Sequence, residues 1–463
     1  MTRSLRLVLA CVAACGPTTA EDPGPPPNLA AIFEPPRETE AAALARADAT
    51  EAAALARADG TSPPSGSGDG PPERSGRPPP DPSACRLPVL VATATTALGW
   101  PGAPIEEPER LAPFFAALDR ADERRVRASV WGGSLIAADG IVSVLRETLQ
   151  CLYGAGGPGF LLPDLMARPG SRARTGRARP ELKTYNVGLG PPSPVPVGVA
   201  GVSYLAEAQA RVRWRVQGAR WATAWLRSRR GRPRLRARVD GERRAPFRVP
   251  DDRRLLPRRF ALPDRARTLA LELLDGTVAV DGVDLVAEKG VVVDTFGVPA
   301  ADPKRFLRAS KRPFGLQLQS LSPDLVAFVL GGNEVGDLRS RRTTRARLEA
   351  ELSRFLERVR RFAPEAACLL VGPIEKIQAT PRAKWKSSPA VAKVRDLQRR
   401  VGAQAGCAFF DPYAAMGGVG AIRALARRGW MHEDLIHPKR AGLDLIGALL
   451  TDALLKAGER VER

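Results

Sequence analysis

A serine, an asparagine and an Asp-x-x-His pair are the residues of this chain whose types and spacing point to chemistry. Only two histidines occur in 463 residues, and the second closes the string Asp434-Leu435-Ile436-His437. A serine hydroxyl is a weak nucleophile until a base takes its proton. His437 is the candidate base for Ser134, and Asp434 can hold the imidazole in the required tautomer. These types predict the hydrolysis of esters through a serine nucleophile.

Such a reaction also needs hydrogen-bond donors for the oxyanion that develops on the substrate carbonyl. The candidate donors are the N–H of Ser134, the side-chain amide of Asn333, and a backbone N–H in Gly297-Val298-Pro299-Ala300, from either Gly297 or Ala300. Read one at a time, Ser134 is a helix cap, Asn333 a turn residue, and Asp434 with His437 a capping turn. Their order along the chain and their places after strands favour the joint interpretation. His432 is expected at the surface.

The elements that position these residues follow an α/β pattern, because short apolar runs alternate with amphipathic stretches. The expected strands are 125–131, 291–296, 325–330, 368–371 and 407–410. The expected helices are 111–121, 139–152, 302–311, 343–362, 391–405 and 440–456, the third ending before Pro313. This pattern predicts a flavodoxin-like, doubly wound, five-stranded parallel sheet. Such sheets bind ligands at the carboxyl ends of their strands, where Ser134 and Asn333 fall.

The segment 165–289 has period-two alternation instead, and is predicted to be an inserted β-sandwich-like domain. Asp240-Gly241 is a hairpin-turn dipeptide, and Asp275-Gly276 separates two further expected strands. Trp214, Trp221 and Trp225 are expected in the sandwich core, although the same residues could stack on sugars.

The N-terminal residues indicate export. Arg3 and Arg6 precede a short apolar run, so residues 1–16 are predicted to be a signal peptide. Val12-Ala13-Ala14-Cys15 is similar to a bacterial lipobox, which would make Cys15 a lipidation site and the protein a cell-envelope lipoprotein; plain secretion is the alternative. Residues 17–84 hold an 11-residue tandem duplication and a Pro/Gly/Ser-rich stretch, and are predicted to be a disordered linker.

Cysteines and charge add weaker constraints. Cys85 and Cys151 are candidates for a disulfide in an oxidising compartment, whereas Cys368 and Cys407 are expected as core residues. No Cys/His spacing suits a metal, and no cofactor is implied. The net charge is +21, although residues 1–84 are acidic. That field suits anionic polymers or surfaces, unless it reflects coding bias alone. No motif for nucleic-acid binding accompanies it.

With these motifs in place, the chain resembles the SGNH, or GDSL-like, hydrolases over about 105–160 and 290–456. Gly132-Gly133-Ser134-Leu135 is similar to the first block of the family, Gly331-Gly332-Asn333-Glu334 to the third, and the string from Asp434 to Pro438 to the fifth. Two departures stand out. Gly133 replaces the usual aspartate beside the nucleophile, and Ala300 replaces the second-block glycine, which strains the backbone if positive φ is required there.

The resemblance implies a serine esterase with Ser134, His437 and Asp434 as its relay. Its substrate is expected to be an acylated glycan, most simply an O-acetyl ester of the cell wall or an extracellular polymer. The rival interpretation is a catalytically silent glycan-binding lipoprotein, and a third is an arginine-driven anchor to an anionic surface. The expected domains are 85–164 and 290–463 for the hydrolase and 165–289 for the insertion between them.

Overall fold

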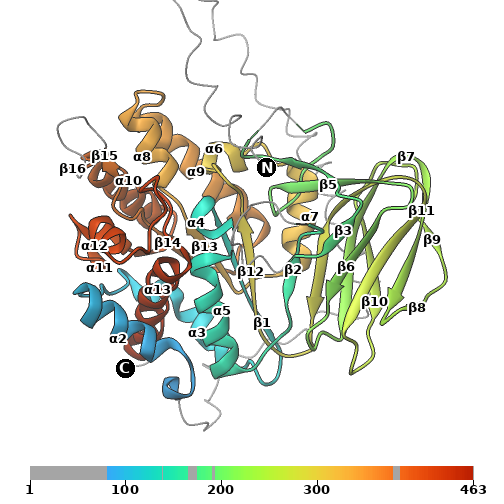
Figure 1. The fold of residues 1–463 in the computed structure, drawn as a ribbon, viewed down its shortest axis with the longest axis horizontal. Helices are drawn as coiled ribbons and strands as arrows, with labels where there is room; N and C mark the ends of the chain where they lie inside the picture. Colours follow the sequence, from blue (N-terminus) through green and yellow to red (C-terminus); the bar gives the residue numbers. More distant parts are fainter. Residues whose placement is uncertain (1–80, 138, 165–174, 190–192, 379–385, 462–463) are drawn as a thin grey trace, which may run out of the picture. The chain divides into compact units, whose positions relative to one another are not determined.

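The computed structural model describes residues 81–137, 139–164, 175–189, 193–378 and 386–461. Within these ranges, five parallel strands form one sheet in the order β12-β1-β13-β14-β17 (Figure 1). Their bounds are β1 Arg125–Gly132, β12 Gly290–Gly297, β13 Leu325–Val329, β14 Ala367–Val371 and β17 Ala408–Phe410. Numbered along the sheet's own chain order, this is the 2-1-3-4-5 arrangement of flavodoxin-like folds. The predicted fold class is confirmed.

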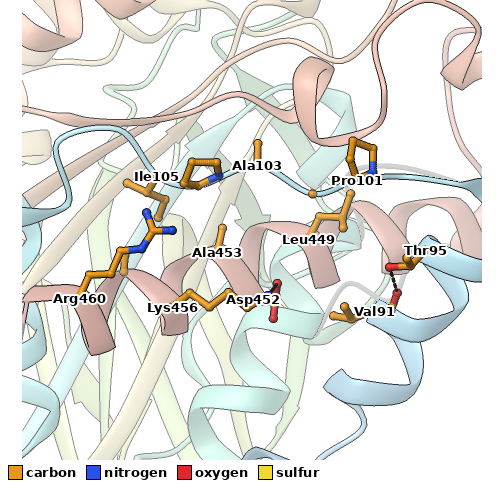
Figure 2. A pocket seen from close by; sticks show the side chains of 13 residues that line it. Val91, Thr95, Pro101, Ala103, Ile105, Leu449, Asp452, Ala453, Lys456 and Arg460 are labelled. Atoms are coloured by element: carbon orange, nitrogen blue, oxygen red, sulfur yellow. Dashed lines mark hydrogen bonds and ion pairs between the residues drawn. The ribbon is translucent and has the colours of Figure 1, made fainter.

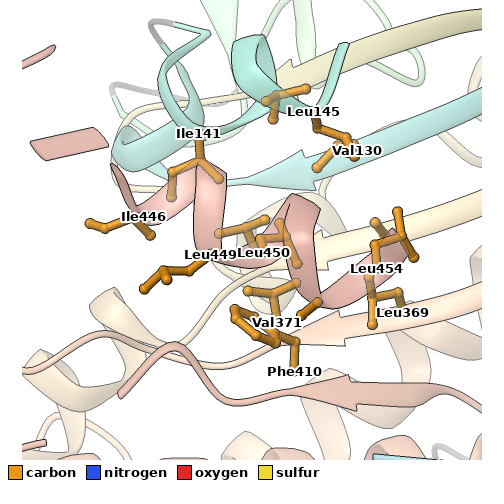
Figure 3. Packing of buried hydrophobic residues seen from close by; sticks show 14 of the residues in the cluster. Val130, Ile141, Leu145, Leu369, Val371, Phe410, Ile446, Leu449, Leu450 and Leu454 are labelled. Carbon is orange, nitrogen blue, oxygen red and sulfur yellow. The ribbon is translucent and has the colours of Figure 1, made fainter. Parts of the chain in front are cut away.

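Helices cover both faces of this sheet. The helices are α2 Leu87–Leu98, α3 Ala112–Leu118, α4 Ser134–Ala137, α5 Gly140–Tyr153, α6 Pro303–Phe306, α7 Lys311–Leu321, α8 Gly332–Arg339, α9 Arg345–Phe362, α10 Ala390–Gln404, α11 Pro412–Ala415, α12 Ala421–Arg427 and α13 Arg440–Val461, with short 3-10 turns at Pro82–Ala84 and Pro108–Leu111. On one face, α5 and α13 pack on the strands through aliphatic side chains such as Ile141, Leu145, Leu450 and Leu454 (Figure 3). On the other face, α7, α9 and α10 build a second core around Phe328 and Phe355.

An antiparallel sheet of ten strands lies between β1 and β12 in the sequence. Its strands are β2 Gly159–Leu161, β3 Arg177–Arg179, β4 Lys183–Asn186, β5 Val202–Glu207, β6 Arg211–Arg215, β7 Trp221–Val239, β8 Glu242–Arg243, β9 Phe247–Arg248, β10 Leu256–Ala261 and β11 Thr268–Val286. A separate two-stranded ribbon is formed by β15 Ile377–Gln378 and β16 Lys386–Ser387.

The ten-stranded sheet folds over itself, which gives it the predicted sandwich-like character. Both ends of β7, represented by Leu226 and Leu235, and both ends of β11, represented by Leu271 and Leu285, enter one apolar cluster. Strands can share a core in this way only if each bends midway, and the pairing of β7 with β11 is shifted repeatedly between Leu273 and Gly282. The sheet therefore has two halves. The proximal half contains the first part of β7 and the last part of β11 and packs on the parallel sheet. The distal half contains the last part of β7 and the first part of β11 and lies on the far side of the apolar cluster.

A buried ion network joins the proximal half to the parallel sheet. The guanidinium of Arg127 on β1 donates from Nη1 to both oxygens of Asp294 on β12, at 2.9 and 2.8 Å, and from Nη2 to both oxygens of Asp284 on β11, at 2.9 Å each. Ser129 Oγ and Phe160 N donate to Asp294 as well. Burial lowers the pKa of Arg127, but the two carboxylates outweigh it and hold that pKa above its ordinary value.

Two sequence expectations need correction. The third predicted helix is instead the short α6 followed by α7, and Pro313 lies inside the first turn of α7, where its missing N–H costs nothing. β11 runs unbroken through Asp275-Gly276, so this dipeptide marks an irregularity in the pairing rather than a break between strands. Cys368 and Cys407 are core residues, as expected, and the structure in addition joins them in a disulfide that the sequence analysis did not predict.

Other expectations hold or fall outside the described residues. Cys85 and Cys151 form a disulfide, and Asp240-Gly241 is the turn between β7 and β8, with φ of 49° and 93°. Trp214 is buried in the sandwich core, as expected, whereas Trp225 is buried in the core that includes Phe328 and Phe355. Trp221 is a correction, because it is only half-buried and lies under the guanidinium of Arg259. The predicted signal peptide, Cys15 and all but the last four residues of the predicted linker lie outside the described residues. No described helix is long and apolar enough to span a bilayer.

Candidate active site

Ser134 stands at the first position of α4, directly after β1 and two glycines. A Cβ on Gly132 would lie 2.4 Å from the carbonyl oxygen of Val329, so only glycine lets β1 and β13 approach this closely there. A Cβ on Gly133 would lie 3.1 Å from Asn333 Nδ2 and 3.2 Å from Ala301 O. The strand-to-helix turn thus presents the serine at the carboxyl edge of the sheet.

The three residues predicted to act together are hydrogen-bonded in series. His437 Nε2 lies 2.8 Å from Ser134 Oγ, and His437 Nδ1 lies 2.6 Å from Asp434 Oδ2. Because a carboxylate accepts at Nδ1, that nitrogen carries the proton and Nε2 is left to accept from the serine. The order Asp434, His437, Ser134 is the arrangement of a serine-hydrolase relay.

Asp434 is held in its ionised form. Partial burial acts to raise its pKa, but the bond from the His437 ring and the backbone N–H groups of His437 and Ile436 lower it below the usual value. Those two N–H groups donate to Asp434 Oδ1 at 3.0 and 2.9 Å, leaving Oδ2 for the ring. The backbone of the loop therefore fixes the orientation of the Asp434 carboxylate, and the carboxylate in turn fixes the orientation of the His437 ring.

Backbone contacts with the preceding residues hold the loop that carries His437. His432 N donates to His437 O at 2.9 Å, and Met431 forms an isolated bridge with Pro438. His432 itself is exposed, as expected, and makes this contact only through its backbone. The side chains of His437 and Asp434 remain 41% and 43% exposed, so a bulky group can reach the relay from solvent.

A cavity of about 320 Å³ opens beside Ser134 and His437. It is bordered by the loops that follow four strands and by the last loop: Gly133 to Leu135, Pro299 to Ala301, Val329 to Glu334, Gly372 to Lys376, and Ile436 with His437. The predicted location at the carboxyl ends of the parallel strands agrees with this geometry.

The predicted oxyanion donors divide into those that border the cavity and one that does not. Ser134, Asn333 and Ala300 line it. Asn333 Nδ2 donates to Ala301 O at 2.8 Å, which fixes the amide and leaves its second N–H for the cavity. Gly297 is a correction: it ends β12 against α4, where a Cβ would lie 2.4 Å from Ala137 Cα, and it lines a separate small cavity.

Ala300 has a φ of +61°. The backbone strain that was expected if this alanine had to adopt a positive φ is therefore present. Replacing it with glycine removes the Cβ penalty of the left-handed region, about 1–2 kcal/mol, against a glycine entropy cost of roughly 0.5–1 kcal/mol. We expect Ala300→Gly to raise the free energy of unfolding by about 0.5–1 kcal/mol in urea titrations. Ala301→Gly, next to it but without positive φ, is the matched control and should lower it. Equal losses from both would contradict strain at Ala300.

Three charged residues of the cavity wall, Glu334, Glu375 and Lys376, were not singled out from the sequence. Glu334 is buried, accepts from Gly331 N at 3.0 Å through Oε2, and has no partner in the structure for Oε1. Lys376 donates to Gly332 O at 2.7 Å, and burial lowers its pKa. Lys376 lies in the loop that follows β14, after Gly372-Pro373. Because parallel sheets bind ligands at the carboxyl ends of their strands, this position could have been predicted to border the site.

Burial, reinforced by the charge of Asp302, raises the pKa of Glu334 to about 8. In the unfolded chain this carboxyl has a pKa of about 4.3. The stabilising contribution of the Glu334 carboxyl is therefore complete at pH values below its pKa in the unfolded chain, and it is lost as the pH rises through about 8. As the pH rises from about 5 to 8, we expect the melting temperature of the wild type to fall relative to that of Glu334→Gln, because the glutamine cannot ionise. Glu357→Gln, at an exposed position of α9, is the control, and parallel wild-type and Glu334→Gln curves would contradict the shift.

A second cavity, of about 260 Å³, lies between α2, α13 and the stretch 101–105 (Figure 2). Its lining includes the Lys456–Asp452 ion pair, with Nζ and Oδ2 2.8 Å apart, and Arg460, but no serine, cysteine or histidine. It therefore lacks a serine–histidine or cysteine–histidine pair. Among the described residues, no cluster of His, Cys, Asp and Glu could hold a metal ion.

Comparison with known proteins agrees with this geometry. Residues 282–445 match the model of the GDSL-like lipase/acylhydrolase family. A structure of a peptidoglycan O-acetylesterase in action is 19% identical, covers 75% of this chain and 96% of its own, and superposes with a TM-score of 0.63, which shows a common fold. A family two carbohydrate esterase from Clostridium thermocellum, an active-site mutant, is 14% identical over 59% of this chain and 97% of its own, with a TM-score of 0.27. No curated protein sequence matches. Residues 282–445 therefore form a GDSL-like lipase/acylhydrolase domain of the SGNH superfamily, and the chain shares its fold with the O-acetylesterase structure.

Proposed function

We propose that the protein is a serine esterase in which Ser134, His437 and Asp434 carry out acyl transfer to water. The observation that supports this most directly is the unbroken series of hydrogen bonds from Asp434 through His437 to Ser134, at the mouth of a cavity. The other histidine of the chain, His432, has no such partner for its ring among the described residues.

The reaction proceeds in two halves. His437 Nε2 takes the proton of Ser134 as Oγ bonds to the ester carbonyl carbon, and then gives that proton to the departing alcohol oxygen as the ester C–O bond breaks. Water next adds to the carbonyl carbon of the acyl-serine, with His437 as base. The tetrahedral intermediate then collapses, which releases the acid and restores Ser134. In both halves the carbonyl oxygen becomes an oxyanion, for which Ser134 N–H, Asn333 Nδ2–H and Ala300 N–H are the proposed donors.

The substrate we propose is an O-acetyl ester of a cell-wall or extracellular glycan. The exposed relay suits an alcohol too large to be enclosed, because the leaving group departs on the solvent side while the acyl group occupies the cavity. The fold shared with a peptidoglycan O-acetylesterase is consistent with this class. Export and lipidation at Cys15 would place the enzyme in the cell envelope, beside such polymers.

The test is release of acetate by the purified chain from O-acetylated peptidoglycan and from acetylated xylan, measured beside p-nitrophenyl esters of two, four and eight carbons. We expect acetate from at least one glycan and a preference for the acetyl ester. Activity confined to the eight-carbon ester would contradict the glycan assignment but keep the esterase. Loss of all activity, with intact folding, would favour the silent glycan-binding alternative.

A further inference from the structure

The outer surface of the distal half of the antiparallel sheet is lined with arginines. Along β6 the side chains of Arg211, Arg213 and Arg215 are exposed, whereas the alternate residues Val212 and Trp214 are buried in the sandwich core. Because successive side chains of a strand point to opposite faces, these arginines point away from that core. Arg236 and Arg238 of β7 alternate with the buried Leu235, Ala237 and Val239 in the same way.

Pairing across the strands aligns these arginines in rows. One row runs from Arg177 on β3 to Arg213, then to Ala270 on β11, then to Arg238 and to Arg243 on β8. In Figure 1, β7, β8 and β11 lie at the edge of the fold farthest from α13, and β3 and β6 lie further in, toward α7.

The neighbouring row runs from Arg179 to Arg211, then to Glu272 and Arg236. We call the outward side chains of these two rows, together with Arg215, the arginine face.

This arrangement is not neutralised within the described protein. Glu272 is the carboxylate of the two rows, and it lies 3.6 Å from Arg211 Nε and 2.6 Å from Arg238 Nε. No ion pair among the described residues reaches Arg213, Arg215 or Arg236. Like charges placed directly opposite one another on a sheet destabilise it. An external anion would offset that repulsion.

On the arginine face, β11 lies between β6 and β7 and contributes Thr268, Ala270 and Glu272 between two lines of guanidiniums. Ala270 is only 3% exposed. With strands about 4.8 Å apart, the two lines are separated by about 10 Å, and arginines of one line repeat about every 6.8 Å. Guanidiniums repeated at that interval suit carboxylates spaced along one extended chain.

We propose that the arginine face binds a strand of anionic polysaccharide, one whose carboxylates pair with the guanidinium forks of Arg213, Arg215 and Arg236. Arginine forks match carboxylate geometry in pairs of hydrogen bonds. A lipid surface fits less well, because the exposed large hydrophobic residues of the described chain are Val89, Leu189, Val419 and Ile436, none of them on this face. Single-stranded nucleic acid fits less well too, since it stacks on aromatic rings that these rows lack.

Binding at this face would hold the esterase on its polymer while the relay, which lies at the edge of the other sheet, remains open. A tether of this kind raises the local concentration of substrate without adding a contact at the catalytic site. The inference rests on the binding surface alone and does not require the protein to be an active esterase.

The experiment uses the full chain and polygalacturonate as the probe, with neutral dextran, vesicles of phosphatidylcholine and phosphatidylglycerol at 7:3, and duplex DNA as the comparison ligands. The test variant is Arg213→Glu/Arg236→Glu. Its matched control is Arg345→Glu/Arg354→Glu, which makes the same change of charge at exposed positions of α9. Melting temperatures establish that each variant is folded.

We expect the Kd for polygalacturonate to rise at least about tenfold in Arg213→Glu/Arg236→Glu and to stay within about twofold in the control, with wild-type binding weakening steeply as NaCl increases. The milder Arg213→Gln/Arg236→Gln should weaken binding less, because it removes the positive charges without introducing negative ones. The proposal is overturned if the two reversed variants bind alike, if dextran binds as well as polygalacturonate, or if vesicles or DNA bind more tightly and respond to the same substitutions.

Discussion

Replacing Ser134 or His437 with alanine should lower kcat for acetyl-ester hydrolysis by about 10³-fold or more, because either change removes the nucleophile or the base on which it depends. The hydrogen bond of 2.8 Å between His437 Nε2 and Ser134 Oγ is the physical reason. His432→Ala is the matched control, since it deletes the other imidazole from the same exposed loop, and it should change kcat less than about twofold.

The double variant Ser134→Ala/His437→Ala should be no slower than the worse of the two single variants, because the residues act as one unit. Purely additive losses would mean that the two side chains contribute separately. A His437→Ala enzyme that keeps most of its activity would contradict the relay outright, as would equal losses from His432→Ala.

Replacing Arg127 with methionine should lower the free energy of unfolding by about 3–5 kcal/mol, because it leaves two buried carboxylates without their counter-charge. Arg127 is 2% exposed and pairs with both Asp284 and Asp294 across the contact between the two sheets. Chemical denaturation followed by circular dichroism measures the loss.

The control for this prediction is Arg127→Met/Asp284→Asn/Asp294→Asn. Neutral amides at the two aspartate positions need no counter-charge, and the amide oxygen that replaces the Asp294 carboxylate could still accept from Ser129 Oγ and from Phe160 N. We expect this triple variant to recover a large part of the lost stability. If Arg127→Met costs no more than an exposed arginine change such as Arg354→Met, the network is not what couples the two sheets.

The sequence predicted the parallel sheet well, because its buried strands are short apolar runs that end at recognisable turns. β13 and β14 are fully buried and were recognised within a residue or two of their ends. Knowing the order of the strands then places Ser134, Asn333 and the last loop at one edge. Few histidines made the base easy to assign, and the structure brings His437 to Ser134.

What the sequence could not supply depends on contacts between distant segments. The alternation of β1 places Arg127 and Ser129 on one face, which by itself is typical of an exposed surface, yet the insertion buries both. Gly297 and Ala300 were equal candidates until the packing of α4 against β12 separated them. Cys368 and Cys407 read as core residues because both lie in apolar runs, and only the pairing of β14 with β17 brings them together.

The most direct test of the proposed relay is covalent labelling of the purified chain with a fluorophosphonate, followed by mass spectrometry of the peptides. This reagent reports an activated serine without any knowledge of the natural substrate. The relay predicts one adduct, on Ser134, that disappears in His437→Ala and persists in His432→Ala. No adduct on the folded wild type, or an adduct on another serine, would contradict the assignment of Ser134 as a nucleophile activated by His437.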